Sequence, residues 1–250
     1  MSPAIARVAA FAALIAFAAP FVHADAIDAA LAHPGRPEAD LKRDALDHPA
    51  DVLGLLELRP GMTVADVLGG SGYYSEILSS LVGPKGHVLL MNNLAYDNWS
   101  DGLQARLAGD RLPNVTHETV DLDDMHLAPG SLDAVLLIKV YRDLYWVDSR
   151  GKWPKIDVSS VLDQLAHALK PHGKILVVDH SAKTGHGNSD ATTLHRIEES
   201  FAINDFKKHG FRLIDKSDVL RMPHDQRDES SYQGPMVGKT DRFVLVFQKT

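Results

Sequence analysis

The sequence predicts an α/β fold in which crossover helices connect the strands of a parallel β-sheet. Helical and strand-like segments alternate from residue 49 to the end of the chain, as they do in sheets built from strand–helix–strand units. A continuous apolar run at residues 133–138 is typical of a strand buried on both faces. A glycine-rich turn at residues 69–72 joins a strand-like segment to a helical one, the place where such sheets bind nucleotide-type ligands.

The first half of the domain is predicted from apolar periodicity and from the residues that break it. Residues 49–58 are expected to form a helix, because Val52, Leu55 and Leu56 fall on one helical face. Residues 63–67 are β-branched and mostly apolar, which predicts the first strand. The further elements expected in this half are a helix at 73–82, a strand at 87–91, a helix at 101–107 and a strand at 115–120.

The second half follows the same alternation and ends in a long polar loop. After the strand at 133–138, we expect a helix at 158–169, a strand at 174–178 and a helix that ends near His209 and places Leu194, Ile197 and Phe201 on one stripe. Two late strands are expected at 211–215 and 242–247. The loop of about 25 residues between them is unusually long for a compact domain, which is typical of functional or mobile segments.

Composition excludes several classes of function. The chain has 250 residues, of which 45% are hydrophobic and 24% charged, as is ordinary for a globular protein. A net charge of −7 with no long basic run gives no support for a nucleic-acid partner. Because there are no cysteines, disulfides and thiolate metal sites are excluded. The thirteen histidines show no compact ligand spacing, so no metal is predicted.

The N-terminus has the layout of a secretory signal. One positive charge at Arg7 precedes an apolar stretch at 8–22 and the small-residue site Val22-His23-Ala24. We therefore expect a signal peptide at 1–24, cleaved after Ala24, a secreted or periplasmic mature protein, and no stable membrane span after cleavage. An uncleaved anchor is the alternative, although the stretch is shorter than the about 20 residues of a spanning helix. Residues 25–46 are expected to form an N-terminal arm with one short helix, and residues 47–250 a single domain.

The glycine turn is the most informative motif. It comprises Asp66-Val67-Leu68-Gly69-Gly70-Ser71-Gly72 and is followed by Tyr73. Glycines allow the backbone to approach a ligand closely, and the following helix offers unpaired N–H groups. A dinucleotide site would need a third glycine and a later acidic residue, but Tyr74-Ser75 and Asn92-Asn93 stand there. The remaining alternatives are a plain tight turn and a site where Asp66 attracts the cationic part of S-adenosylmethionine.

These residues resemble the first motif of the class I S-adenosylmethionine-dependent methyltransferases. The resemblance continues in register from Pro49 to Lys249, through the segments 60–64, 83–88, 114–121, 132–136 and 169–176. The tracts Asp179-His180, Leu194-His195-Arg196-Ile197 and 238–244 are similar to a narrower group, the exported "predicted methyltransferases".

The resemblance implies a Rossmann-like methyltransferase fold with a seven-stranded, mostly parallel sheet, an antiparallel last strand and helices on both faces. It implies S-adenosylmethionine as the cofactor. The segment 138–141 would border the methyl group and the substrate. The residues expected to hold the cofactor are Asp66, Gly70, Gly72 and Tyr73, with Asn92 facing the ribose and Asp121 and Leu122 near the adenine.

Four residues at the ends of central strands are candidates for catalysis. Tyr141 and Asp143 follow the fourth strand, and Asp179 and His180 follow the fifth, on the side of the sheet where ligands bind. Methyl transfer needs alignment and a desolvated nucleophile, and it needs a base only when the acceptor loses a proton. A packed Tyr141 and a capping or ion-paired Asp179 are the structural alternatives.

The sequence favours an exported methyltransferase of unknown small-molecule or protein acceptor. A non-catalytic binding protein that reuses the fold is the second hypothesis, since fold does not determine function. Two departures from the motif motivate it: Leu68 stands where the first glycine is usual, and Asn92 stands where the ribose-binding acid is usual. An oxidoreductase is disfavoured by the missing third glycine.

Overall fold

The computed structural model describes residues 24–250. The predicted signal peptide falls on residues 1–23 and its cleavage point, and so lies outside the described residues apart from Ala24. The described chain forms a seven-stranded sheet with the order β3-β2-β1-β4-β5-β7-β6. β7 pairs antiparallel with both β5 and β6, whereas the pairs among β1 to β5 are parallel. The predicted topology is therefore confirmed.

The elements agree closely with the predicted alternation. The strands are β1 (Thr63–Val67), β2 (His87–Asn92), β3 (Val115–Thr119), β4 (Leu132–Ile138), β5 (Leu169–His180), β6 (Phe211–Ser217) and β7 (Arg242–Lys249). The helices are α1 (Ala24–Leu31), α2 (Glu38–Asp47), α3 (Pro49–Gly54), α4 (Tyr73–Val82), α5 (Leu94–Trp99), α6 (Leu103–Leu107), α7 (Val158–Ala168) and α8 (Glu199–Lys208), with a short 3₁₀ turn η2 at Tyr141–Tyr145.

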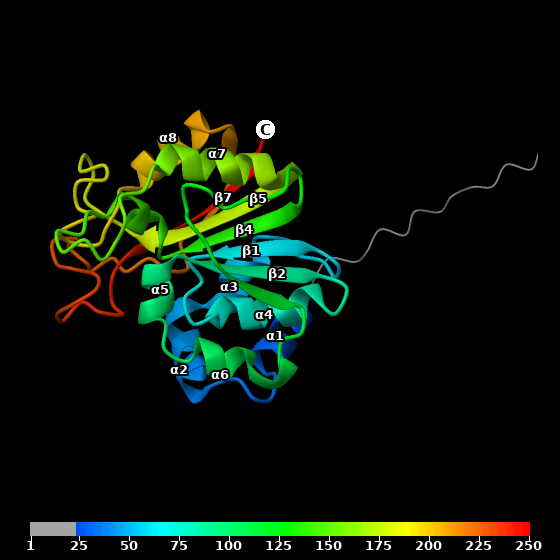
Figure 1. The fold of residues 1–250 in the computed structure, drawn as a ribbon. Helices are drawn as coiled ribbons and strands as arrows, with labels where there is room; N and C mark the ends of the chain where they lie inside the picture. Colours follow the sequence, from blue (N-terminus) through cyan, green and yellow to red (C-terminus); the bar gives the residue numbers. More distant parts are fainter. Residues whose placement is uncertain (1–23) are drawn as a thin grey trace, which may run out of the picture.

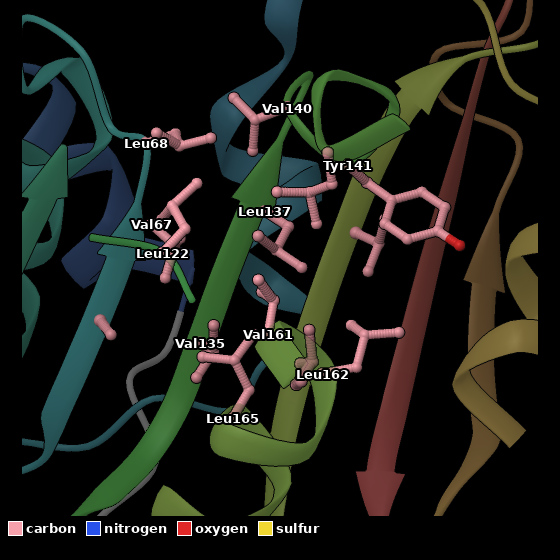
Figure 2. Packing of buried hydrophobic residues seen from close by; sticks show 14 of the residues in the cluster. Val67, Leu68, Leu122, Val135, Leu137, Val140, Tyr141, Val161, Leu162 and Leu165 are labelled. Carbon is pink, nitrogen blue, oxygen red and sulfur yellow. The ribbon is translucent and has the colours of Figure 1, made fainter. Parts of the chain in front are cut away.

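Helices cover both faces of the sheet. Alternate residues of β4 point to opposite faces, so that Leu136 packs with α1, α3 and α4 while Val135 and Leu137 pack with α7 and α8. Figure 1 shows α7 and α8 on one side of the sheet and α1, α3 and α4 on the other. Figure 2 shows Val161, Leu162 and Leu165 of α7 packed on the β4 face. Burial on both faces explains why β4 is apolar throughout.

Residues 25–46 form two helices where the sequence predicted one short one. Ile27 and Ala30 of α1 are buried in the core beside α3 and α4. In α2, Asp40 is held by Arg106 of α6 at 2.7 Å. Arg36, just before α2, pairs with Asp44 at 2.7 Å. This segment is thus a packed layer of the domain, built largely from charged contacts that apolar periodicity does not reveal.

Two other local predictions are wrong. The helix expected to carry Leu194 and Ile197 begins only at Glu199, because His195 has a positive φ of 50° and Ile197 bridges Ser181 as extended backbone. Helix α5 was not predicted, since it exposes Leu94 and Trp99 and has no apolar stripe. Its start is fixed by the Asn93 side chain, which accepts a hydrogen bond from Tyr96 N–H.

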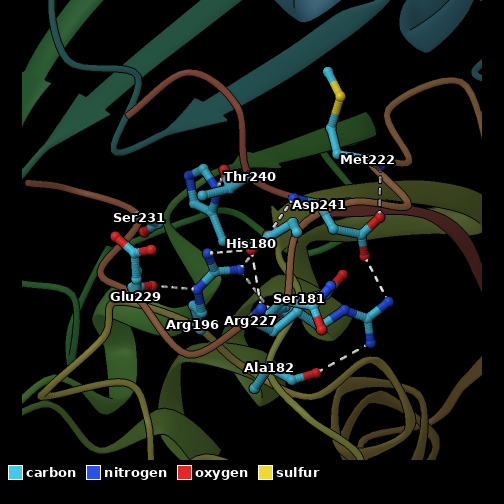
Figure 3. Close-up of polar contacts among 12 residues, drawn as sticks. His180, Ser181, Ala182, Arg196, Met222, Arg227, Glu229, Ser231, Thr240 and Asp241 are labelled. Carbon is cyan, nitrogen blue, oxygen red and sulfur yellow. Dashed lines mark hydrogen bonds and ion pairs between the residues drawn. The ribbon is translucent and has the colours of Figure 1, made fainter. Parts of the chain in front are cut away.

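The long polar segment 218–241 is tied to the sheet by buried arginine contacts. The fully buried Arg196 donates to both carboxylate oxygens of Asp225 and to the backbone carbonyls of Ser181 and Glu229. Arg227 pairs with Asp241 at 2.8 Å. Figure 3 shows the contacts of Arg196 with Ser181 and Glu229, and of Arg227 with Asp241, near His180 and Thr240. The segment is therefore an ordered wall of the domain.

Replacing Arg196 with methionine is expected to lower the free energy of unfolding by about 3 kcal/mol, because the buried carboxylate of Asp225 loses its cationic partner. Chemical denaturation of the protein measures this change. Arg212→Met, which removes an exposed arginine from β6, is the matched control and should change stability by less than about 0.5 kcal/mol. Equal effects of the two substitutions would contradict this account of how the segment is anchored.

Candidate functional site

A cavity of about 420 Å³ lies at the carboxyl ends of the central strands. Its walls come from α2, the glycine turn after β1, the start of α4, the ends of β4 and β5, the start of β7 and the segment 231–240. In Figure 1 the loops around residues 181–198 and 218–241 gather at this edge of the sheet, beyond the end of β5. This is the edge where open α/β sheets bind ligands.

Asp66 lies in this cavity at the end of β1, as predicted. Its buried carboxylate accepts a hydrogen bond from Ser75 Oγ at 2.7 Å. Burial raises the pKa of Asp66 to about 6, although the Ser75 contact and the charge of Arg43 act in the opposite direction. A Cβ added to Gly69 would lie 2.6 Å from Asp66 Oδ2, so the turn leaves room for this carboxylate only with glycine there. The site thus holds a costly buried carboxylate that a cationic group would stabilise.

The glycine turn after β1 has left-handed backbone at several positions, including Leu68, where the usual motif has glycine. Leu68 has a φ of 54° and is buried in the core, so a leucine adopts a conformation that glycine would adopt with less strain. Gly70, with a φ of 60°, lines the cavity. Gly72, with a φ of 81°, lies at the start of α4 facing Leu90 and Arg106 instead. Gly72 shapes the turn without lining the cavity.

Asn92, which was predicted to face the ribose, is buried beneath the glycine turn and does not line this cavity. Its side chain accepts from Gly70 N–H at 2.9 Å and donates to Gly70 C=O at 3.0 Å and to Asp97 at 2.9 Å. The amide is fully buried and therefore fixes the glycine turn to the end of β2. An acid here could not donate to the Gly70 carbonyl, which gives Asn92 a structural reason to be an amide.

Asp121 and Leu122 line a second cavity, of about 530 Å³, between α5 and the end of β3. Asn93 lies in the same wall, and its buried Nδ2 is without a hydrogen-bond partner among the described residues. A buried donor of this kind costs about 1–3 kcal/mol unless something accepts from it. The predicted cofactor residues therefore divide between two cavities, Asp66 and Tyr73 in one and Asp121 and Leu122 in the other.

Three of the four predicted catalytic residues do not line the cavity. Tyr141 is fully buried and donates to Asp205 of α8, and Figure 2 shows its ring lying across β5, away from Leu68. Asp179 accepts from the backbone N–H and the guanidinium of Arg142, both at 2.8 Å. Asp143 accepts from Tyr96 Oη at 2.7 Å. These positions favour structural roles, because each of the three side chains already makes hydrogen bonds within the protein that hold the segment after β4 in place.

His180 does line the cavity, as the prediction requires. Its Nδ1 lies 2.6 Å from Thr240 Oγ1, and Figure 3 shows this contact beside Arg196. Burial and the nearby cations Arg142 and Lys139 lower the pKa of His180 well below its usual range. The ring is therefore neutral at pH 7, and its Nε2, which contacts no polar group among residues 24–250, is left to a ligand.

A charged cluster around Asp47 was not predicted from the sequence. The buried Asp47 carboxylate accepts from Arg43 at 2.7 Å, from Lys139 at 2.8 Å and from Arg242. All four side chains line the cavity. Burial and Arg43 lower the pKa of Lys139 to about 8, with Asp47 opposing them. The spacing of Arg43 and Asp47 predicts a helical ion pair, but only the packing of α2 on the strand ends brings Lys139 and Arg242 to it.

Comparison with known proteins places this turn in a methyltransferase context. The sequence model of the family Protein-L-isoaspartate(D-aspartate) O-methyltransferase (PCMT) matches residues 44–99. The Protein-L-isoaspartate O-methyltransferase of Methanothrix thermoacetophila is 56% identical over 34 residues, 14% of this chain and 16% of that protein. The Ubiquinone/menaquinone biosynthesis C-methyltransferase UbiE of Idiomarina loihiensis is 23% identical over 64% of this chain and 57% of the relative. The chain thus matches less than two thirds of each relative's length.

Among solved structures, a SAM dependent methyltransferase from Aquifex aeolicus has a TM-score of 0.61 to this chain. It is 19% identical, and the match covers 92% of this chain and 100% of the other. The predicted resemblance to the class I S-adenosylmethionine-dependent methyltransferase superfamily is confirmed by this fold and by the first-motif match. Membership of the narrower exported group stays a prediction.

Two properties of residues 24–250 bear on possible partners. No group of three or more histidine and carboxylate side chains in this part of the chain could hold a metal ion. None of its helices is long and apolar enough to cross a bilayer.

The raised pKa of Asp66 predicts a pH-dependent contribution to stability. A carboxyl whose pKa is higher in the folded state stabilises the fold below its unfolded pKa of 3.8, and this contribution is lost as the pH rises through about 6. The stability of Asp66→Asn relative to the unsubstituted protein should therefore rise by up to about 3 kcal/mol between pH 4 and pH 7.5. Urea unfolding at both pH values measures this, with the exposed Asp51→Asn as control. A pH-independent difference would contradict the assigned environment of Asp66.

Proposed function

We propose that this protein is an S-adenosylmethionine-dependent methyltransferase whose acceptor is not yet identified. The observation that carries the proposal is the buried carboxylate of Asp66 under a glycine turn at the end of β1, facing a cavity and lying in the segment that matches a methyltransferase family. The fold shared with a methyltransferase over nearly the whole chain supports it.

The residues present fit the cofactor at both ends. Asp66 would hold the α-amino group, and Arg43 would hold the carboxylate, because its guanidinium lines the cavity and only its Nε is taken by Asp47. Asn93 offers its unpartnered Nδ2 to the adenosine half, beside Leu122 and Asp121. When bound, S-adenosylmethionine supplies a methyl group on a sulfonium, which an acceptor nucleophile displaces. The protein would contribute alignment and exclusion of water.

The second hypothesis, a binding protein without catalysis, is less favoured. Its motivation was that Leu68 stands where the first glycine is usual and that Asn92 lacks the charge of the usual ribose-binding acid. Leu68 is buried in the core cluster and forms part of the cavity wall beside Gly70, so it lines the cavity without filling it. Asn92 braces the turn, so its amide reflects a structural need. Transfer of a labelled methyl group to any acceptor would exclude this hypothesis.

Calorimetric titration of the mature protein with S-adenosylmethionine and S-adenosylhomocysteine tests the proposal. We expect both to bind, and Asp66→Asn to weaken binding at least tenfold, because the amide cannot pair with the ligand ammonium. Affinity should also fall as the pH drops below about 6, since protonation of Asp66 competes with the ligand. The exposed Asp51→Asn is the control. Absence of heat with both ligands would contradict the proposal.

We further propose that the protein acts outside the cytoplasm, on the basis of residues 1–24. Fusion of the chain to alkaline phosphatase, which is active only after export, tests this in a bacterial host. The full-length fusion should be active and a fusion lacking residues 2–24 inactive. If the two fusions had the same activity, the export proposal would be wrong.

A further inference from the structure

The floor of the Asp66 cavity carries more positive than negative charge. Around Asp47, three cationic side chains share one carboxylate: Arg43, Lys139 and Arg242. Asp47 stays ionised, because Lys139 and Arg43 hold its pKa well below the usual range. When Asp66 pairs with the cofactor ammonium and Arg43 with the cofactor carboxylate, Lys139 and Arg242 still share the single carboxylate of Asp47. Lys139 uses its ammonium on Asp47 alone among the described residues, so it has a donor left for an anion.

The walls of the same cavity are aromatic. Four of the six tyrosines in the sequence line it: Tyr73, Tyr74, Tyr96 and Tyr232. Tyr96 and Tyr232 are also the two ends of a continuous run of rings. Centroid distances between neighbouring rings in this run are 5.3–6.3 Å, through His195, Trp146 and Trp99, with Trp153 stacked on Trp99. Trp99 and Trp146 therefore lie in the run of rings between Tyr96 and Tyr232, and Trp153 packs against both.

The rim of the cavity is apolar and open to solvent. Leu46, Tyr232 and Val237 line the cavity, and their side chains are 48%, 72% and 53% exposed. Exposed large apolar side chains cost solubility and usually mark a place where something binds. An apolar rim over a cationic floor matches a ligand that has an apolar body and an anionic group.

We propose that this cavity recognises its methyl acceptor as an aromatic anion, a phenolic carboxylic acid, whose ring packs between Tyr96 and Tyr232 and whose carboxylate pairs with Lys139 and Arg242. This inference rests on the proposed function and names the chemical class of the acceptor. Aromatic rings stack on tyrosine faces with a preference that saturated rings lack. The two cations come from the ends of β4 and β7, so the rigid sheet sets the distance between ring and charge.

Methylation of such a molecule balances without a further reactant. A bond forms between the phenolic oxygen and the methyl carbon, the pair of the broken carbon–sulfur bond stays on the sulfur, and the phenolic proton is lost. His180 lines the cavity, and in the tautomer whose Nδ1–H donates to Thr240 Oγ1 its Nε2 would accept that proton.

Binding of 4-hydroxycinnamate to the protein saturated with S-adenosylhomocysteine tests the proposal. Calorimetry reports it directly, and tryptophan fluorescence reports it because Trp99 and Trp146 lie in the run of rings that joins Tyr96 to Tyr232. We expect 4-hydroxycinnamate to bind at least tenfold more tightly than its uncharged methyl ester and than the non-aromatic cyclohexanecarboxylate. Equal affinity for the three probes, or none for 4-hydroxycinnamate, would overturn the proposal.

Matched variants test the charge contact of Lys139 and the ring contact of Tyr232 separately. Lys139→Met should weaken the binding of 4-hydroxycinnamate about tenfold and leave the binding of its methyl ester unchanged. Lys216→Met on β6 should change the binding of neither probe. Tyr232→Leu should weaken the binding of both aromatic probes. Tyr232→Phe should bind them as the unsubstituted protein does, because phenylalanine keeps the ring. The exposed Tyr232 can be replaced without affecting folding, so the test stands even if Lys139→Met is unstable. Unchanged binding in Tyr232→Leu would contradict the aromatic wall. Failure of S-adenosylhomocysteine to bind would instead count against the proposed function.

Discussion

The buried carboxylate of Asp47 accepts hydrogen bonds from cations that belong to three separate parts of the chain. Arg43 lies one turn earlier in α2, Lys139 follows β4 and Arg242 begins β7. Burying these charges is costly, and the cost is offset only because all four groups meet with good geometry. This contact fixes α2 over the strand ends and so builds one wall of the cavity.

The same contact explains how the cavity can bind both a cationic and an anionic group. Asp66 and the glycine turn supply a carboxylate for a cationic group, and the cluster around Asp47 supplies cations for anionic ones. The two lie at neighbouring strand ends, since β1 pairs with β4 in the sheet. The segment 218–241, held by Arg196, closes the opposite side with Tyr232 and Thr240. The cavity therefore has fixed charges on one side and apolar surface on the other, an arrangement that aligns a ligand and excludes water.

Local patterns predicted most of the fold. The bounds of β1 and α4 agree with prediction because a β-branched run and an amphipathic run are each bounded by glycines. The helix predicted from the stripe of Leu194, Ile197 and Phe201 was wrong over its first part. His195 has a positive φ and Ile197 pairs with Ser181, so this backbone is not helical despite the helical spacing. Asp66, Gly70 and His180 could be placed in the cavity from motif and strand-end position alone. Tyr141, Asp143 and Asp179 could not be excluded from it, since strand-end position does not tell which way a side chain points.

Long-range contacts account for what the sequence did not indicate. Arg43, Asp47, Lys139 and Arg242 are ordinary surface residue types, and the contacts between Asp47 and Arg242 span 195 positions. The contact of Asn92 with Gly70 was not predicted for the same reason, because the two residues lie 22 positions apart and meet only in the packed fold. Such roles depend on the packed fold and have no local signature.

A crystal structure of the protein with bound S-adenosylhomocysteine tests the central claim most directly. The account predicts the α-amino group on Asp66, the carboxylate on Arg43, the adenine beside Leu122, and the sulfur facing the part of the cavity between His180 and Tyr232. A ligand bound elsewhere, or one whose adenine lies on the Asp47 cluster, would contradict it.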